Sequence, residues 1–297
     1  MNVLSLFDGI SCGKVALDRA VIKYDKYYAS EIDKYAIKIA MKNHPDIIQL
    51  GDVRDVKDET LPEIDLLMGG SPCQGFSFAG KQLNFGDPRS QLFFEFVRIL
   101  KEVKPKYFLL ENVKMKKEFQ DVITSYLGFE PIEINSALVS AQNRRRLYWT
   151  NISDIEQPKD KKIYLKDILE DGIVDRDKSY CIDANYFKGG NLKQYFEKHR
   201  RQLVFDREPH NNKFKQTATQ SYLSPKHKTL LANAGDKTRG IGIHNEKGFW
   251  RKLTPVECER LQTLPDNYTE GISNTQRYKT LGNGWTVDVI AHILSYM

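Results

Sequence analysis

The sequence has no long hydrophobic run and few cysteines. None of its apolar stretches approaches the about 20 residues that a membrane-spanning helix needs, so we expect no membrane partner. Its four cysteines lie far apart without a C-x-x-C pair, which predicts reduced thiols in a cytoplasm and no metal site. No basic residue precedes the short apolar run of residues 1–7, which argues against a signal peptide.

A full G-x-G-x-x-G dinucleotide fingerprint is also missing, which leaves a NAD-linked enzyme only as an alternative.

The chain carries a net positive charge, and one segment accounts for all of it. The formal net charge is +6, and residues 155–250 contain 19 Lys and Arg against 13 Asp and Glu, so the remainder is neutral. This segment is also rich in Asn, Gln, Thr and His, which suits a surface that binds nucleic acid. The alternative is a solvated surface lobe.

Short apolar runs alternate with helical patterns through the first half of the chain. Strands are expected at 3–7, 27–30, 47–50, 64–68 and 107–110, with helices at 14–20, 33–43, 91–103 and 116–127. This alternation predicts an α/β fold with a mostly parallel sheet flanked by helices. The carboxyl ends of parallel strands meet at one edge, where open sheets of this kind place their ligands.

Acidic residues follow the expected strands at this edge. Glu31 stands where a carboxylate can accept hydrogen bonds from ribose hydroxyls. Asp52 can accept from the amine of a purine while Val53 packs on its ring. The alternative interpretations are a surface acid at a helix start and a turn aspartate.

A cysteine in a glycine-rich loop follows the strand at 64–68. The loop reads Gly69-Gly70-Ser71-Pro72-Cys73-Gln74-Gly75 and presents Cys73 at the strand end, as a candidate nucleophile or a half-buried thiol in a plain turn. The polar stretch 79–90 after it is a candidate lid. Glu111 ends the next expected strand and is a candidate proton donor or amine acceptor beside Cys73.

Three consecutive arginines precede a further extended segment at 146–152. If that segment is a strand, Arg144 and Arg146 share one face, and their guanidinium groups can bind a carboxylate, a carbonyl oxygen or a phosphate, while Arg145 points away.

These residues resemble the ordered motifs of the C5-cytosine DNA methyltransferases, of bacterial or phage type. The resemblance rests on Phe7-Asp8-Gly9, Ser71-Pro72-Cys73-Gln74, Glu111-Asn112-Val113, Gln142-x-Arg144-x-Arg146, Thr254-Pro255-Val256-Glu257 and Leu281-Gly282-Asn283-Gly284. It covers residues 1–152 and 250–297. It implies a Rossmann-like S-adenosylmethionine-dependent methyltransferase fold with a smaller target-recognition lobe. Cys12 and Trp285 depart from the usual motifs, and Trp285 is interpreted as packing.

The resemblance implies four catalytic residues. Cys73 would add to C6 of a flipped-out cytosine, and Glu111 would hydrogen-bond N3 and the exocyclic amine. Arg144 would hold the pyrimidine carbonyl, and Arg146 would support the loop or the nucleophile.

The resemblance also implies a binding site for S-adenosyl-L-methionine, with S-adenosyl-L-homocysteine as the product. The residues expected there are Phe7, Asp8, Gly9, Gly13, Glu31, Ile32, Asp52, Val53, Pro72, Leu92 and Asn283.

Three domains follow from these patterns: a catalytic domain at 1–154, a target-recognition lobe at 155–250 and a segment at 251–297 that returns to the catalytic domain. Residues 216–221 and 233–239 are candidate DNA contacts. We expect a monomer that binds double-stranded DNA at a short specific sequence, with a cognate restriction endonuclease acting separately. A tRNA cytosine-5 methyltransferase and a non-catalytic DNA-binding relative are the alternatives.

Overall fold

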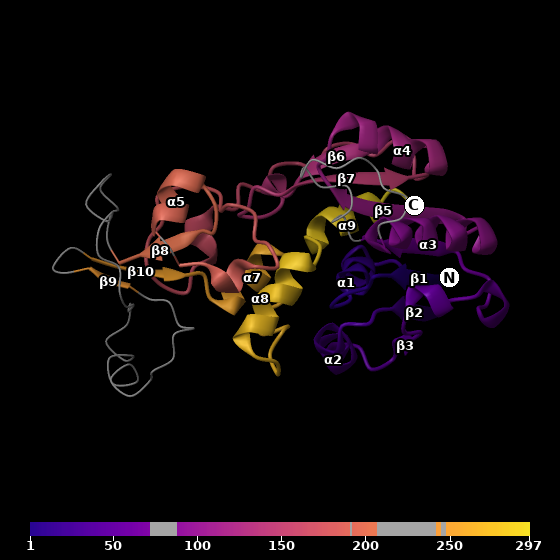
Figure 1. The fold of residues 1–297 in the computed structure, drawn as a ribbon, viewed down its shortest axis with the longest axis horizontal. Coiled ribbons are helices and arrows are strands. Elements are labelled where there is room, and N and C mark those ends of the chain that lie inside the picture. Colours follow the sequence, from indigo (N-terminus) through magenta and orange to yellow (C-terminus); the bar gives the residue numbers. More distant parts are fainter. Residues whose placement is uncertain (72–87, 191, 207–241, 245–247) are drawn as a thin grey trace. The chain divides into compact units, whose positions relative to one another are not determined.

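The computed structural model describes residues 1–71, 88–190, 192–206, 242–244 and 248–297. The chain divides into two compact units. Unit 1 comprises Met1–Asn135, Arg145–Lys159 and Trp285–Met297, and unit 2 comprises Ser136–Arg144 and Asp160–Gly284. Unit 1 is therefore assembled from three separate stretches of the sequence (Figure 1).

Unit 1 contains a seven-stranded sheet in the order β3-β2-β1-β4-β5-β7-β6. Its strands are β1 (Asn2–Leu6), β2 (Lys26–Ser30), β3 (Ile48–Gln49), β4 (Leu66–Gly69), β5 (Tyr107–Val113), β6 (Ile132–Asn135) and β7 (Arg145–Thr150). Strands β1 to β5 pair in parallel, and β7 is antiparallel to both β5 and β6. The predicted mostly parallel sheet is confirmed. Its order reverses at β1, so the carboxyl ends of β1, β2 and β4 border a topological switch point.

Helices flank this sheet (Figure 1). They are α1 (Cys12–Arg19), α2 (Lys34–Asn43), α3 (Pro88–Val103), α4 (Lys117–Leu127) and α9 (Val287–Leu294). The central strands are mostly apolar because helices cover them: Leu4, Leu67 and Leu110 are fully buried, together with Phe93 and Phe96 of α3.

Local sequence explains where several helices begin and end. The Asp33 carboxylate accepts the Tyr35 N–H at 2.9 Å and caps α2. Helix α4 stops at Gly128, whose φ of 80° suits a residue without a side chain. Helix α7 (Pro255–Leu261) has Pro255 in its first turn and a complete capping box between Thr254 and Glu257, as its sequence predicts.

Unit 2 contains a three-stranded antiparallel sheet in the order β8-β10-β9. Its strands are β8 (Leu203–Phe205), β9 (Gly242–His244) and β10 (Gly248–Lys252), and its helices are α5 (Leu192–Lys198), α7 and α8 (Asn274–Asn283). Leu192, Tyr195, Leu203, Phe205 and Trp250 form its own core cluster. Short 3-10 helices occur in unit 1 at Val53–Asp55 and Asp58–Thr60, and in unit 2 at Ser136–Leu138, Leu165–Ile168 and Tyr186–Lys188.

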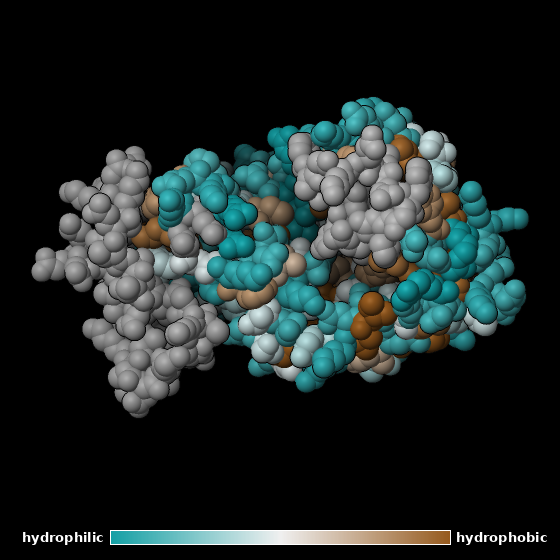
Figure 2. Space-filling model, viewed as in Figure 1, coloured by the Kyte–Doolittle hydropathy of each residue, from teal (hydrophilic) through white to brown (hydrophobic). Residues whose placement is uncertain are grey.

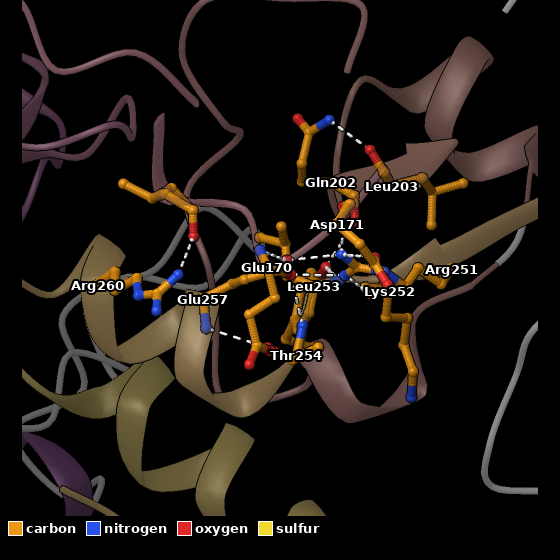
Figure 3. Close-up of polar contacts among 12 residues, drawn as sticks. Glu170, Asp171, Gln202, Leu203, Arg251, Lys252, Leu253, Thr254, Glu257 and Arg260 are labelled. Atoms are coloured by element: carbon orange, nitrogen blue, oxygen red, sulfur yellow. Dashed lines mark hydrogen bonds and ion pairs between the residues drawn. The ribbon is translucent and has the colours of Figure 1, made fainter. Parts of the chain in front are cut away.

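A buried ion pair ties strand β10 to helix α7 in unit 2 (Figure 3). Both guanidinium NH groups of Arg251 donate to the Glu257 carboxylate at 2.6 Å, and Arg251 also binds Asp171. The same carboxylate accepts the backbone N–H groups of Thr254 and Glu170 at 2.8 Å. Glu257 is fully buried, so these four donors replace the water that its charge has lost.

The surface is mostly hydrophilic on the face shown in Figure 2, with separate hydrophobic patches. Among the described residues, Val21 and Ile32 are the most exposed large hydrophobic side chains, at 83% and 72%. No helix within the described ranges combines the length and hydrophobicity that a bilayer crossing requires.

Candidate functional site

The loop after β1 is hydrogen-bonded to the end of β2. Asp8 N–H donates to the Ser30 carbonyl at 3.1 Å, and Gly9 N–H donates to Glu31 Oε2 at 2.8 Å. The other carboxylate oxygen of Glu31 accepts the N–H groups of Ile32 and Asp33, both at 2.8 Å. Glu31 is thereby held at the switch point as a fixed acceptor. The Gly9 φ of 61° lets the chain turn there, and a methyl group added to it would meet open space.

Asp8 points inward from this loop. Its carboxyl group accepts hydrogen bonds from the Tyr27 hydroxyl at 2.7 Å and from the Ser11 hydroxyl. Burial raises the pKa of Asp8 above its usual value, against the opposing effect of the hydrogen bond from Ser11. The Asp8 side chain therefore shapes the loop from within, and Phe7 packs against the core beside it.

The residues after β2 and β3 provide an exposed apolar side chain and a second carboxylate. Ile32 is 72% exposed although it is large and hydrophobic. Asp52 caps the 3-10 helix that begins at Val53, and hydrogen bonds from Arg54 lower its pKa to about 2. Asp52 is thus an ionised acceptor. Val53 is buried in the core cluster, at 4% exposure.

The chain leaving β4 is fastened to β5. Asn112 Nδ2 donates to the Ser71 hydroxyl at 3.4 Å, and both side chains are buried. No local sequence pattern links Ser71 to Asn112, so this contact is not predictable from the sequence. Pro72, Cys73 and residues 79–87 of the expected lid follow Ser71 and lie outside the described residues, as do 216–221 and 233–239.

Glu111 and Arg146 form an ion pair at the end of β5. Arg146 Nε lies 2.9 Å from Glu111 Oε1, and both side chains are largely buried. The pair arises from register, because Arg146 stands opposite Val113 in the β5–β7 pairing and so lies on the same face as Glu111. The second oxygen of Glu111 accepts the indole N–H of Trp285 at 3.2 Å.

Arg144 has a different environment within unit 2. Strand β7 begins only at Arg145, and Arg144 is 3% exposed. Its guanidinium group donates to the carbonyls of Ile182, Gly282 and Gly284 at 3.0, 3.3 and 2.9 Å. These last two carbonyls lie at the carboxyl end of α8, where a cation is favoured. Asn283, between them, is exposed.

Two further expected residues are in the interior of unit 1. Gly13 stands in the first turn of α1, where an added side chain would come within 2.9 Å of Met68 and 3.1 Å of the Tyr27 hydroxyl. Leu92 is partly buried against the core from α3. A side chain at Gly13 would therefore displace the end of the Met68 side chain and crowd the Tyr27 hydroxyl.

The whole chain, residues 1–297, matches the family described as C-5 cytosine-specific DNA methylase. The chain belongs to this family. This DNA methylase is 33% identical over 318 residues to the type II methyltransferase M1.ScrFI of Lactococcus lactis subsp. cremoris, which covers all of this chain and 77% of that one. It is 30% identical over 328 residues to M.FnuDI of Fusobacterium nucleatum, over 99% of this chain and 93% of that one.

The solved structure of the Entamoeba histolytica methyltransferase EhMeth shares the fold, with a TM-score of 0.72 at 19% identity, covering 100% of this chain and 97% of that one. Family membership makes this DNA methylase a DNA (cytosine-5-)-methyltransferase that depends on S-adenosylmethionine. The predicted family, fold class and enzyme activity are confirmed.

The described residues at the switch point of the DNA methylase fit such a methyl donor. A nucleoside offers hydroxyl and amino donors and an apolar ring, and Glu31, ionised Asp52 and exposed Ile32 offer the matching acceptors and apolar surface. All three follow adjacent parallel strands of one sheet.

Proposed function

We propose that this DNA methylase methylates C5 of a cytosine flipped out of duplex DNA, through a covalent bond between Cys73 and C6. The observation that carries the proposal is the buried Glu111–Arg146 pair. It stands at the end of β5, next to β4, whose end leads through Ser71 to the nucleophile. A carboxylate and a guanidinium group with matched donors and acceptors are suited to hold one polar ring.

Cys73 supplies the activation that cytosine needs. C5 is a poor nucleophile, and addition of the Cys73 thiolate to C6 raises its electron density. Once C5 has accepted a methyl group, loss of the C5 proton and departure of the Cys73 sulfur restore the aromatic ring. In a duplex, stacking covers C6, so the base leaves the stack before the thiolate can reach it.

Glu111 steadies the ring while the sulfur adds. Each of its oxygens has two acceptor sites, so Glu111 can keep its bonds to Arg146 and Trp285 and still accept a hydrogen bond from the exocyclic amine of the base. N3 is itself an acceptor, so the bond between Glu111 and N3 forms when a proton lies between them, as it does when N3 gains basicity on addition of the sulfur.

In this proposal Arg144 and Arg146 exchange the roles that the sequence resemblance implies for them. Arg146 contacts Glu111 and is therefore the better candidate to hold the pyrimidine carbonyl. Arg144 donates to the backbone carbonyls on both sides of Asn283 and so stabilises the backbone of the motif Leu281-Gly282-Asn283-Gly284.

S-Adenosylmethionine supplies an electrophilic methyl group on a sulfonium. We propose that Glu31 binds its ribose, that Asp52 binds the adenine amine and that Ile32 contacts the adenine ring. Phe7, Asp8, Gly9 and Gly13 shape the neighbouring loop. Pro72, Leu92, Val53 and Asn283 remain proposed contacts.

We further propose that residues 155–250 read a short DNA sequence, on the basis of their positive charge. The enzyme would act as a monomer in the cytoplasm of a bacterial or phage-infected cell. A cognate restriction endonuclease would act separately on the same sequence.

The covalent step predicts a trapped adduct. DNA carrying 5-fluorocytosine in the target sequence should bind irreversibly in the presence of S-adenosylmethionine, because fluorine cannot leave C5 as a proton does. A denaturing gel should then show a protein–DNA band that survives heating. The target is first found by bisulfite sequencing of treated DNA. An enzyme that methylates the same sequence without forming this band would contradict the covalent mechanism.

The exchanged arginine roles predict different defects in two matched variants. Arg146→Gln should slow single-turnover methyl transfer about a hundredfold or more, because it removes a charged contact to the base, and should also lower the melting temperature, because the largely buried Glu111 carboxylate loses its ion-pair partner. Arg144→Gln should mainly lower the free energy of unfolding, by about 3 kcal/mol, since buried carbonyls lose their charged donor. Arg145→Gln is the control, because Arg145 is exposed and pairs with Glu133 at 3.4 Å. It should change neither the rate of methyl transfer nor the free energy of unfolding. A rate defect confined to Arg144→Gln would reverse our assignment.

A further inference from the structure

Trp285 contacts the carboxylate of Glu111 directly. Its indole N–H donates to Glu111 Oε2 at 3.2 Å, while Arg146 binds Oε1 at 2.9 Å. The two carboxylate oxygens are thus held from two sides, by a residue of β7 and by a residue 174 positions away along the chain. A carboxylate held at both oxygens has little freedom to rotate about its last bond.

Two glycines leave room for this contact. A methyl group at Gly70, just after β4, would lie 2.9 Å from Trp285 Nε1 and 3.2 Å from Glu111 Oε2. A methyl group at Gly13 would lie 3.4 Å from the far edge of the indole ring. The indole therefore reaches from the start of α1, past the end of β4, to Glu111.

The backbone that carries Trp285 is well anchored within unit 1. Trp285 is 9% exposed and stands just before α9, which packs against α1. Asp288 in the first turn of α9 forms an ion pair with Arg19 of α1. The indole N–H is thus presented from the residue just before the N-cap of a packed helix.

We infer that Trp285 is a positioning residue for Glu111: its indole N–H fixes the direction of the carboxylate before the base arrives. This inference rests on the proposed role of Glu111. An indole N–H is a hydrogen-bond donor that does not ionise at neutral pH, so Trp285 orients the carboxylate and takes no part in proton transfer. Its loss should therefore affect the rate of the chemical step and leave substrate binding largely unchanged.

The variant Trp285→Phe removes the N–H and keeps an aromatic ring. We expect the single-turnover rate of methyl transfer to fall about tenfold, the size of effect typical of a lost hydrogen bond to a charged group. The dissociation constant for S-adenosylmethionine, measured by calorimetry, should change less than about twofold, because the donor site at Glu31 is intact.

Trp149→Phe is the matched control. Trp149 is fully buried in the same unit, and its indole N–H donates to the Thr124 hydroxyl at 3.1 Å. It stands opposite Leu110 in the pairing of β5 and β7, so its side chain lies on the other face of the sheet from Glu111. This substitution removes the same chemical group. It should lower the melting temperature without lowering the single-turnover rate.

A double-mutant cycle with Glu111→Gln separates positioning from packing. If Trp285 acts through the carboxylate, Trp285→Phe should slow the Glu111→Gln enzyme less than about twofold. A tenfold loss in both backgrounds would mean that the ring acts by packing, and the inference would fail. An unchanged rate for Trp285→Phe in the wild-type background would also overturn it. An unchanged rate for Glu111→Gln alone would instead refute the proposed role of Glu111.

Discussion

Replacing Cys73 with serine is expected to lower methyl transfer by at least about a thousandfold, because a serine hydroxyl has far less anionic character than a thiol at neutral pH. Transfer of a labelled methyl group to DNA measures the loss. Binding of S-adenosylmethionine, measured by calorimetry, should persist, since Glu31 and Asp52 remain. The 5-fluorocytosine adduct should disappear in the same variant.

Cys181→Ser is the control for this substitution. Cys181 is half-buried, and its sulfur lies 3.3 Å from Arg144, where a serine oxygen can accept the same donor. Its activity should stay close to that of the wild type. Among the described cysteines, burial raises the pKa of Cys258 well above its usual value, so that thiol is a poor substitute nucleophile. Retained turnover in Cys73→Ser would refute the assigned nucleophile.

Replacing Glu257 with alanine is expected to destabilise the enzyme by about 3–5 kcal/mol, the cost of leaving a buried charged partner alone. Arg251 would lose its bidentate partner, and the backbone N–H groups of Thr254 and Glu170 would lose their acceptor. Denaturant unfolding followed by circular dichroism gives the free energy.

The matched control is Glu197→Ala, which makes the same substitution at an exposed position of α5. It should change the free energy of unfolding by no more than about 0.5 kcal/mol. The double variant Arg251→Ala with Glu257→Ala should lose less stability than the two single variants added together, because no buried charge is left unpaired. Additive losses would show that the ion pair is not what makes Glu257 important.

Much of unit 1 could be predicted because its strands and helices have recognisable local sequence patterns. Buried parallel strands are continuous apolar runs, and the expected strand at 107–110 reappears as the first part of β5. The end of that strand was missed, since Glu111 and Asn112 are polar and read as a loop. Their polar groups are satisfied by Arg146, Trp285 and Ser71, which only the tertiary structure brings near.

The arginine run shows why a site is harder to predict than a fold. Alternation along an extended chain places Arg144 and Arg146 on one face, but the strand begins at Arg145 and the two side chains have unrelated partners. Trp285 was interpreted as packing because no local pattern links an indole to a carboxylate in another part of the chain. Contacts of this kind depend on long-range register, which a single sequence does not contain.

The three-part construction of unit 1 has a consequence for synthesis of the protein. Helix α9 and Trp285 are synthesised long after α1 and Glu111, yet α9 packs on α1 and the Trp285 indole contacts Glu111. A nascent chain can pair β1, β2, β4 and β5 well before Trp285 is translated, but until then the Glu111 carboxylate lacks its indole donor. Catalytic competence should therefore emerge only after Trp285 and α9 have been translated, and premature termination upstream of Trp285 should release a polypeptide unable to modify the genome.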